Sequence, residues 1–336
     1  MKPAPDVSVI MAAWQASGFI EGAVRSVLAQ KGVALELIVV DDASGDDTLR
    51  AAERAAAGDP RLVLDRLPVN SGPSAARNRA IALATGRYLA VVDCDDTLEP
   101  GRLARLVAFA DETGADLVAD NMNRVCEIGA AASQAFLDPD ALVEPAAITL
   151  AEYLDPETEA RFGENLGYLK PLFRAERISR LGDAYDVTLR NSEDYYLVAR
   201  LLAEGAIFQL HPSQGYNYLV REGSISHRLT PELTQAILDA DAAFAERYAP
   251  AFDNAARRAH ARRRKALERS HSFECVVAAL KARRLDQALR ALARRPSALA
   301  STAATLTAIG WAKIGGGADQ KNVATTQKAT DQTAAQ

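Results

Sequence analysis

The chain has 336 residues, of which 49% are apolar, and its formal net charge is -5. Such a chain can bury a full core, so the composition indicates a globular protein with one large domain and an accessory part. Its three widely spaced cysteines, Cys94, Cys126 and Cys275, exclude a disulfide framework and paired zinc knuckles. The start MKPAPDVSVI shows no long apolar segment, so we expect a cytoplasmic protein.

Short apolar runs alternate with amphipathic helical patterns through the first 120 residues. This alternation is typical of βα units and of a mostly parallel sheet, and it predicts an α/β fold. We expect strands at residues 7–11, 35–40, 62–67, 88–92 and 116–119. We expect helices at residues 19–28, 48–57, 75–84 and 102–110, where apolar residues recur at a helical period.

The later part of the chain is less regular. Residues 136–164 are interrupted by prolines, which predicts a loop or insertion; residues 193–203 read as a helix, followed by the short strand AIFQL and the segment GYNYLVR. Beyond residue 230 the pattern is helical and rich in Ala and Arg. The predicted organisation is a catalytic domain over 1–230 with halves at 1–120 and 121–230, a basic helical region over 231–314, and a disordered tail over 315–336.

Two acidic clusters directly follow predicted strands: Asp41 with Asp42, and the run from Asp93 to Asp96. Ligands of such sheets bind beyond the carboxyl ends of the strands, which argues against simple solvated turns. Asp93 and Asp95 alternate along an extended chain and therefore project to one side. Carboxylates without thiols suit Mg²⁺ or Mn²⁺, whose remaining ligands are water and substrate phosphates. The pattern predicts a divalent-cation site that a diphosphate completes.

Five sequence blocks occur in a recognisable order: SVIMAAWQAS (8–17), VVDDASGDDT (39–48), NSGPSAARNRA (70–80), DCDD (93–96) and SEDYYL (192–197). Together they resemble the family-2 glycosyltransferases, which have the GT-A fold of nucleotide-diphospho-sugar transferases. The resemblance covers about two thirds of the chain and is closest to bacterial exopolysaccharide glucosyltransferases of the succinoglycan type. It implies a UDP-sugar donor, with glucose as the sugar, and Mn²⁺ or Mg²⁺ as the cofactor.

The resemblance also implies roles for particular residues. Asp41 or Asp42 would contact the base, normally uracil, and Arg77 would help to hold the nucleotide. The alternatives are a turn-capping role for Asp42 and a surface helix charge for Arg77. Asp93 and Asp95 match the DxD motif, which places the first carboxylate near the ribose and the second on the metal; both are expected in the metal site.

The acceptor hydroxyl needs a group that takes its proton as the new bond forms. Family members place this base in an ED motif at the start of a helix, which here is Glu193 and Asp194. The resemblance therefore implies that Asp194 is the catalytic base of an inverting displacement. Acidic residues also stabilise helix N-termini, which is the alternative role for both residues.

Three further residues are weaker candidates. Trp14 stands where the family has tyrosine, so it either stacks on the base or packs within the protein. His227 and Arg221 lie in a region where related enzymes carry residues that touch phosphate or metal. A lone surface histidine usually has no such role, and we expect none for His227.

Residues 254–295 hold 13 Lys or Arg against three acids, a net of +10. Basic amphipathic helices bind anionic membranes, so residues 254–314 are expected either to contact a membrane surface or to cap the catalytic domain. Residues 298–314 are too short and Thr-rich for a membrane span. The absence of an interleaved aromatic platform argues against nucleic acid as partner.

The predicted function is a metal-dependent glycosyltransferase that adds a sugar to an oligosaccharide on a polyprenyl diphosphate. The second hypothesis is a non-catalytic scaffold for nucleotide-sugar binding or polysaccharide assembly, against which the intact Asp93, Asp95 and Asp194 argue. The third hypothesis is a dinucleotide-binding oxidoreductase, against which the sequence MAAWQASG argues, because it stands where G-x-G-x-x-G would follow the first strand.

Overall fold

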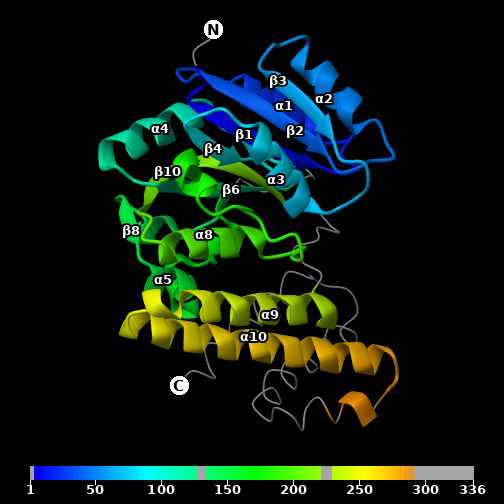
Figure 1. Ribbon diagram of the computed structural model, residues 1–336, viewed down its shortest axis with the longest axis vertical. Helices are drawn as coiled ribbons and strands as arrows, with labels where there is room; N and C mark the ends of the chain where they lie inside the picture. Colours follow the sequence, from blue (N-terminus) through cyan, green and yellow to red (C-terminus); the bar gives the residue numbers. More distant parts are fainter. Residues whose placement is uncertain (1–3, 127–133, 221–228, 285, 289, 291–336) are drawn as a thin grey trace. The chain divides into compact units, whose positions relative to one another are not determined.

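The computed structural model describes residues 4–126, 134–220, 229–284, 286–288 and 290 (Figure 1). The chain divides into two compact units, residues 1–225 with 242–262, and residues 226–241 with 263–336. The first unit contains the sheet and the motifs of the predicted catalytic domain. The second unit contains helical segments of the C-terminal part.

The described strands of the first unit form one sheet in the order β3-β2-β1-β4-β9-β6-β10-β5, with β7 beside β6 and β8 beside β10. Their bounds are β1 (Val7–Ala13), β2 (Leu35–Asp41), β3 (Leu62–Arg66), β4 (Tyr88–Val91), β5 (Thr97–Leu98), β6 (Leu117–Cys126), β7 (Gln134–Ala135), β8 (Ala146–Ile148), β9 (Leu172–Arg174) and β10 (Phe208–Val220). The pairs β1–β2, β2–β3, β1–β4 and β6–β10 are parallel. The central strands are apolar on both faces, as expected for a sheet covered on both sides.

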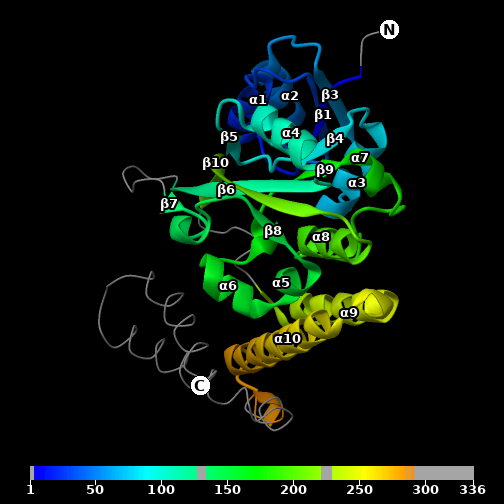
Figure 2. The ribbon, with the colours of Figure 1, turned by 90° about the vertical axis from the view of Figure 1, so that its left-hand side faces the viewer.

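Helices cover both faces of this sheet (Figure 2). They are α1 (Ile20–Leu28), α2 (Thr48–Ala56), α3 (Pro73–Leu83), α4 (Arg102–Thr113), α5 (Leu150–Leu154), α6 (Pro156–Phe162), α7 (Ala175–Ser179) and α8 (Glu193–Ala203). Figure 2 shows α1, α2 and α4 on one side and α3 and α8 on the other. The mostly parallel α/β architecture is therefore confirmed, and the five predicted early strands correspond to β1, β2, β3, β4 and β6.

Three features differ from the expectations. Residues 136–164 contain α5, α6 and the edge strand β8 rather than an irregular loop, because Thr149 forms a capping box with Glu152 and Asp155 caps α6. Residues 208–210 of AIFQL and 215–220 of GYNYLVR belong to one strand, β10, whose register shifts between His211 and Tyr216. Pro212 lies in this shift, where its missing N–H costs no ladder bond.

The third difference is β9, which the sequence analysis did not predict. It lies between β4 and β6 and is antiparallel to both, with Leu172 opposite Ala90 on one side and Val118 on the other. A strand of three residues is too short to show an alternating pattern. Its place in the sheet brings the residues that precede it to the carboxyl end of β4.

The last two described helices are α9 (Pro231–Tyr248) and α10 (Asn254–Lys281). In the first unit, Phe244 of α9 contacts Tyr196, Tyr248 and Phe252, and Arg262 of α10 pairs with Asp155. In the second unit, Thr234 hydrogen-bonds His271, and Val276, Ala279 and Ala288 form a small buried cluster. The predicted boundary near residue 230 stays a prediction, as does the tail from 315, which lies outside the described residues.

No helix in the described part of the chain is both long and apolar enough to cross a membrane.

Candidate active site

The carboxyl ends of β2, β1 and β4 meet at one edge of the sheet because these three strands are parallel neighbours. Asp41 ends β2, Asp42 follows it, and Asp93 follows β4 after one residue. On the adjoining face, α3 supplies Arg77 and the first turn of α8 supplies Glu193 and Asp194. Ser192, in a left-handed conformation with φ 66°, directs the chain into α8.

Five charged side chains form one cluster at this edge, here called the charge cluster: Arg77, Asp93, Lys170, Glu193 and Asp194. Arg77 contacts Asp93 at 2.8 Å through Nη2 and Glu193 at 2.6 Å through Nη1, and its Nη1 lies 3.5 Å from Asp194. The Lys170 ammonium lies 2.9 Å from Asp93 Oδ2 and 2.7 Å from Asp194 Oδ2. The structure thus brings together Arg77, Asp93 and Asp194, which lie in three separate sequence motifs.

Burial and charge act in opposite directions on the carboxylates of the charge cluster. Burial alone would raise the pKa of Asp93, but Lys170 and Arg77 outweigh it and hold that pKa well below its usual range. Burial would likewise raise the pKa of Asp194, and Arg77 and Lys170 again lower it. Asp194 is therefore ionised at neutral pH, which is the state that a general base requires.

Arg77 is 5% exposed, so it is not the surface helix charge that was the alternative to a ligand role. Its guanidinium carbon lies 5.4 Å from the ring centroid of Tyr185. Because its contacts go to Asp93 and to the ED pair, the present geometry shows it orienting acidic side chains. Its predicted contact with the nucleotide stays a prediction.

Asp41 and Asp42 lie outside the charge cluster and bind nearby backbone. Asp41 accepts hydrogen bonds from the Ser44 N–H and lies 3.3 Å from Arg66 Nε. Asp42 accepts from the Ser71 N–H at 2.6 Å and the Gly72 N–H at 2.8 Å. Gly72 has φ 90°, a conformation that favours glycine, so Asp42 fixes the turn that leads into α3. Their predicted contact with the base stays a prediction.

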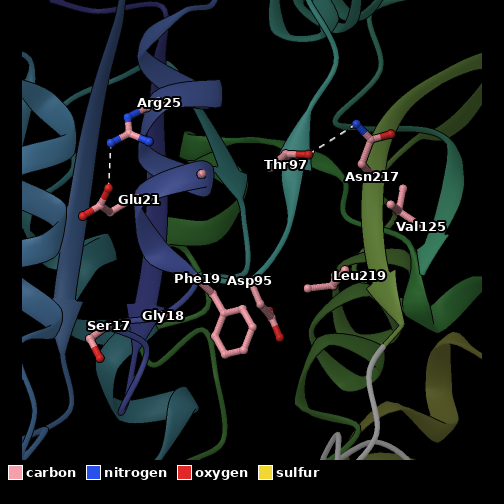
Figure 3. Close-up of a pocket in the computed structure, with 11 residues that line it drawn as sticks. Ser17, Gly18, Phe19, Glu21, Arg25, Asp95, Thr97, Val125, Asn217 and Leu219 are labelled. Atoms are coloured by element: carbon pink, nitrogen blue, oxygen red, sulfur yellow. Dashed lines mark hydrogen bonds and ion pairs between the residues drawn. The ribbon is translucent and has the colours of Figure 1, made fainter. Parts of the chain in front are cut away.

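Asp95 lies away from these contacts and lines a pocket of about 530 Å³. The pocket is formed by the start of α1 and by β5, β6 and β10; Figure 3 shows Asp95 beside Phe19, with Leu219 pointing toward them. Thr97 and Asn217 close one wall through a 3.3 Å hydrogen bond. Asp95 lines this pocket, whereas Asp93 belongs to the charge cluster.

The third carboxylate of the run, Asp96, is buried and accepts hydrogen bonds from Tyr216 Oη at 2.7 Å and from the Leu219 N–H at 2.8 Å. Burial, together with the charges of Asp93 and Asp95, raises its pKa to about 8. Tyr216 also accepts a 3.1 Å hydrogen bond from the Asp93 N–H, so this tyrosine connects β10 to the acidic run at residues 93–96. Side chains alternate between the two faces of the strand along GYNY, which places Tyr216 on the inner face. This alternation is the signal in the sequence that could have identified Tyr216.

A divalent cation fits the residues on the pocket side. Among the described residues, no group of three or more His, Cys, Asp or Glu side chains is arranged to hold a metal ion. Mg²⁺ and similar cations bind through one or two carboxylates and take substrate phosphates and water as further ligands. Asp95 provides such a carboxylate, whereas both oxygens of Asp93 pair with Arg77 and Lys170. The metal role predicted for Asp93 and Asp95 stays a prediction.

The weaker candidates are placed as follows. Trp14 is 49% exposed, which excludes a core-packing role. His227 and Arg221 lie outside the described residues.

Comparison with solved structures shows the class of fold. The structure of TarS from S. aureus in complex with UDP-GlcNAc superposes with a TM-score of 0.57 at 20% identity, covering 87% of this chain and 92% of that one. The mannosyltransferase PcManGT from Pyrobaculum calidifontis, in complex with GDP-Man and Mn²⁺, superposes with a TM-score of 0.59 at 21% identity, covering 99% and 87%. The fold is the GT-A fold.

Sequence comparison shows the family. The family model Glycosyl transferase family 2 matches residues 8–135. The succinoglycan biosynthesis protein ExoO of Rhizobium meliloti is 39% identical over 295 residues, covering 88% of this chain and 83% of ExoO. ExoU of the same organism is 39% identical over 224 residues, covering 66% and 64%. The chain belongs to glycosyl transferase family 2, and it is a glycosyltransferase.

Proposed function

We propose that the protein is an inverting, metal-dependent glycosyltransferase of exopolysaccharide biosynthesis. It transfers glucose from UDP-glucose to a hydroxyl of an oligosaccharide on a polyprenyl diphosphate, at the inner face of the plasma membrane. The names of ExoO and ExoU, two succinoglycan biosynthesis proteins, support the pathway class. The observation that carries the proposal is the Lys170 ammonium, which lies within 2.9 Å of both Asp93 and Asp194 and so joins the donor motif to the base motif.

The proposed reaction is a single displacement. The acceptor hydroxyl oxygen forms a bond to the anomeric carbon while the bond from that carbon to the diphosphate oxygen breaks. The hydroxyl proton passes to Asp194, and UDP leaves with the electron pair of the broken bond. Attack opposite the leaving group inverts the anomeric configuration.

The other residues orient the reactants. Arg77 and Lys170 hold Asp93 and Asp194 in fixed positions, so neither carboxylate must be reorganised during the reaction. Asp95 would hold a divalent cation that, when bound, supplies the Lewis acidity that stabilises the departing diphosphate. Asp42, by fixing the turn before α3, keeps Arg77 at the edge of the sheet.

The first test is calorimetric binding of UDP and GDP to the wild type and to Asp95→Asn, with and without Mn²⁺. We expect Mn²⁺ to strengthen UDP binding in the wild type and to have little effect in the variant. Glu21→Gln, which changes another carboxylate on the same pocket, is the matched control and should keep the Mn²⁺ effect. UDP binding that is equally strong without Mn²⁺ would reject metal dependence.

Transfer itself is measured with radiolabelled UDP-glucose, UDP-galactose and GDP-mannose and with lipid-linked oligosaccharides extracted from Rhizobium meliloti lacking ExoO. We expect label from UDP-glucose in the lipid fraction, and transfer lowered about 1000-fold to a measurable residual level in Asp194→Asn with UDP binding retained. UDP binding by a wild type that transfers no label from any donor would favour the non-catalytic scaffold instead.

A further inference from the structure

Lys170 belongs to none of the sequence motifs, and its side chain is buried among charged groups. The residue is 8% exposed, and its ammonium contacts Asp93 and Asp194 at 2.9 and 2.7 Å. Burial lowers the stability of its charged form, but Asp194 and Asp93 reverse this effect and raise its pKa above the ordinary value. A buried ammonium is stable only with such partners, so its position is set by the two carboxylates.

The backbone of Lys170 is fixed by a second set of contacts, which involve buried residues. Its carbonyl accepts a 2.8 Å hydrogen bond from Arg102 Nη2, and Arg102 forms a fully buried ion pair with Asp120 at 2.8 Å. The guanidinium carbon of Arg102 lies 5.1 Å from the ring centroid of Tyr216. Space is tight here, because a Cβ on Gly215 would lie 2.4 Å from Asp120 Oδ2. The anchor of Lys170 is therefore the first residue of α4, which is itself held to β6 through Asp120.

The strand pairing explains why Lys170 reaches Asp93. Lys170 lies two residues before β9, which runs antiparallel to β4 with Leu172 opposite Ala90. Continuing this register places Lys170 beside the end of β4, where Asp93 follows. Pro171 separates Lys170 from the strand and restricts Lys170 to an extended backbone.

Lys170 and Arg77 divide the three carboxylates of the charge cluster between them. Arg77 makes its short contacts with Asp93 and Glu193 and reaches Asp194 only at 3.5 Å. The shortest ion pair of Asp194 is with Lys170, through Oδ2. Without Lys170, the carboxylates of Asp93 and Asp194 would face each other with Arg77 as their shared cation. Their repulsion would then move Asp194 from its position.

We propose that Lys170 is a positioning residue for the reaction: it acts through Asp194, holding this carboxylate in a fixed position relative to the donor-side Asp93. The proposal rests on the proposed function, in which Asp194 accepts the acceptor proton. Lys170 pairs with Oδ2 of Asp194 at 2.7 Å, whereas Arg77 approaches Oδ1 only to 3.5 Å, so the proposal assigns proton acceptance to Oδ1. Donor and base are thereby aligned before the acceptor arrives.

The test is a double-mutant cycle of the wild type, Lys170→Met, Asp194→Asn and the variant with both changes. For each protein, kcat is measured with UDP-glucose and the lipid-linked oligosaccharides described above, the Kd for UDP by calorimetry, and the melting temperature. We expect Lys170→Met to lower kcat about 100-fold, in the range that general-base catalysis contributes. The Kd for UDP should change less than about tenfold. In the Asp194→Asn background, Lys170→Met should lower kcat less than about threefold, because the effects of residues that act as a unit are not additive.

Two outcomes would overturn the proposal. Equal losses of kcat in both backgrounds would show that Lys170 acts independently of Asp194, and a Kd for UDP that weakens as much as kcat would make it a donor-binding residue. The control Lys31→Met removes an exposed ammonium and should leave all three measurements unchanged. If Lys170→Met does not fold, the cycle is run with Lys170→Gln, which keeps a polar side chain of similar length.

The conservative variant Lys170→Arg retains the charge and should recover at least about tenfold of the kcat lost in Lys170→Met. Recovery that is no better than with Gln would contradict a role for the cation. Absence of transfer by the wild type would reject the proposed function itself. Transfer by the wild type with additive effects in the cycle would reject only the role of Lys170.

Discussion

Asp41 and Asp42 show how acidic residues at a strand end can stabilise the backbone of the neighbouring loops. Both are nearly fully buried, and their oxygens accept hydrogen bonds from N–H groups of the loops that follow β2 and precede α3. Hydrogen bonds to a charged acceptor are among the stronger ones in proteins, and an N–H left unpaired in a buried place costs free energy. In this structure Asp42 stabilises the turn before α3.

We therefore predict that Asp42→Asn lowers the free energy of unfolding by about 2 kcal/mol, because the amide can accept from only one of the Ser71 and Gly72 N–H groups. Urea unfolding followed by circular dichroism measures this change. Asp47→Asn is the matched control, since Asp47 is exposed and its side chain makes no capping hydrogen bond. Unchanged stability together with a weaker Kd for UDP would instead support contact with the base.

The residues of the candidate site differ in how far the sequence could predict them. Asp93 and Asp194 stand in motifs of fixed order, so the resemblance to a family predicted a role for each; the structure brings both residues to one cluster, and the roles stay predictions. Lys170 stands alone before an unpredicted strand, and no local pattern marks a lysine that folds back onto two carboxylates. Asp96 is adjacent to Asp95, but only the fold shows that it is buried under Tyr216.

At the scale of elements, one carboxylate links the three strands at the centre of the sheet. Asp116 directly precedes β6; its side chain pairs with Arg174 at the end of β9 and Arg177 of α7, and accepts from the Ile207 N–H just before β10. Strand β9 pairs with only a few residues on each side, so side-chain contacts of this kind help to fix its register. Such long-range contacts are invisible to local periodicity, which is why β9 was missed while the longer strands were predicted.

These contacts give the stability a pH dependence. Burial alone would raise the pKa of Asp116, but Arg177, the Ile207 N–H and Arg174 outweigh it and lower the pKa below its ordinary value of 3.8. A carboxyl whose pKa is lowered by folding contributes stability above its unfolded pKa and loses it as the pH falls through the folded pKa. The wild type should therefore have a higher free energy of unfolding than Asp116→Asn at neutral pH, and this difference should disappear below about pH 4.

The measurement is the free energy of unfolding of both proteins by urea from pH 7 to pH 2.5. We expect a constant difference above about pH 5 that shrinks below about pH 4. Asp183→Asn, at an exposed aspartate, is the control and should follow the wild type throughout. A difference that is the same at pH 7 and pH 2.5 would mean that packing, not charge, explains the role of Asp116.

At the scale of the whole molecule, alternation of buried strands with amphipathic helices was sufficient to predict the α/β fold, because each βα unit carries its own local signal. The C-terminal region was predicted as helical for the same reason, and α9 and α10 confirm this for the described residues. The excess of basic residues in the C-terminal part of the sequence can be followed on α10. Among the basic residues of α10, Arg262, Arg263 and Arg264 pair with acidic side chains, whereas Arg257, Arg258, Lys265 and Arg269 are exposed.

Exposed basic side chains suit an anionic surface, where each contributes about 1 kcal/mol near a membrane. We therefore predict that the protein floats with liposomes containing phosphatidylglycerol and not with phosphatidylcholine liposomes. Reversal of the exposed charges by Arg257→Glu, Arg258→Glu, Lys265→Glu and Arg269→Glu should abolish flotation. The wild type should also lose it at high salt, because exposed charges are screened.

The control for this experiment must separate a specific surface from net charge. Lys31→Glu with Arg50→Glu reverses two exposed charges of the catalytic domain, and a pair limited to Arg257→Glu and Arg258→Glu makes the same change in net charge on α10. We expect the α10 pair to weaken flotation much more than the catalytic-domain pair. Equal weakening would show that only the overall charge matters, and equal flotation of all variants would leave α10 as a helical cap without a membrane role.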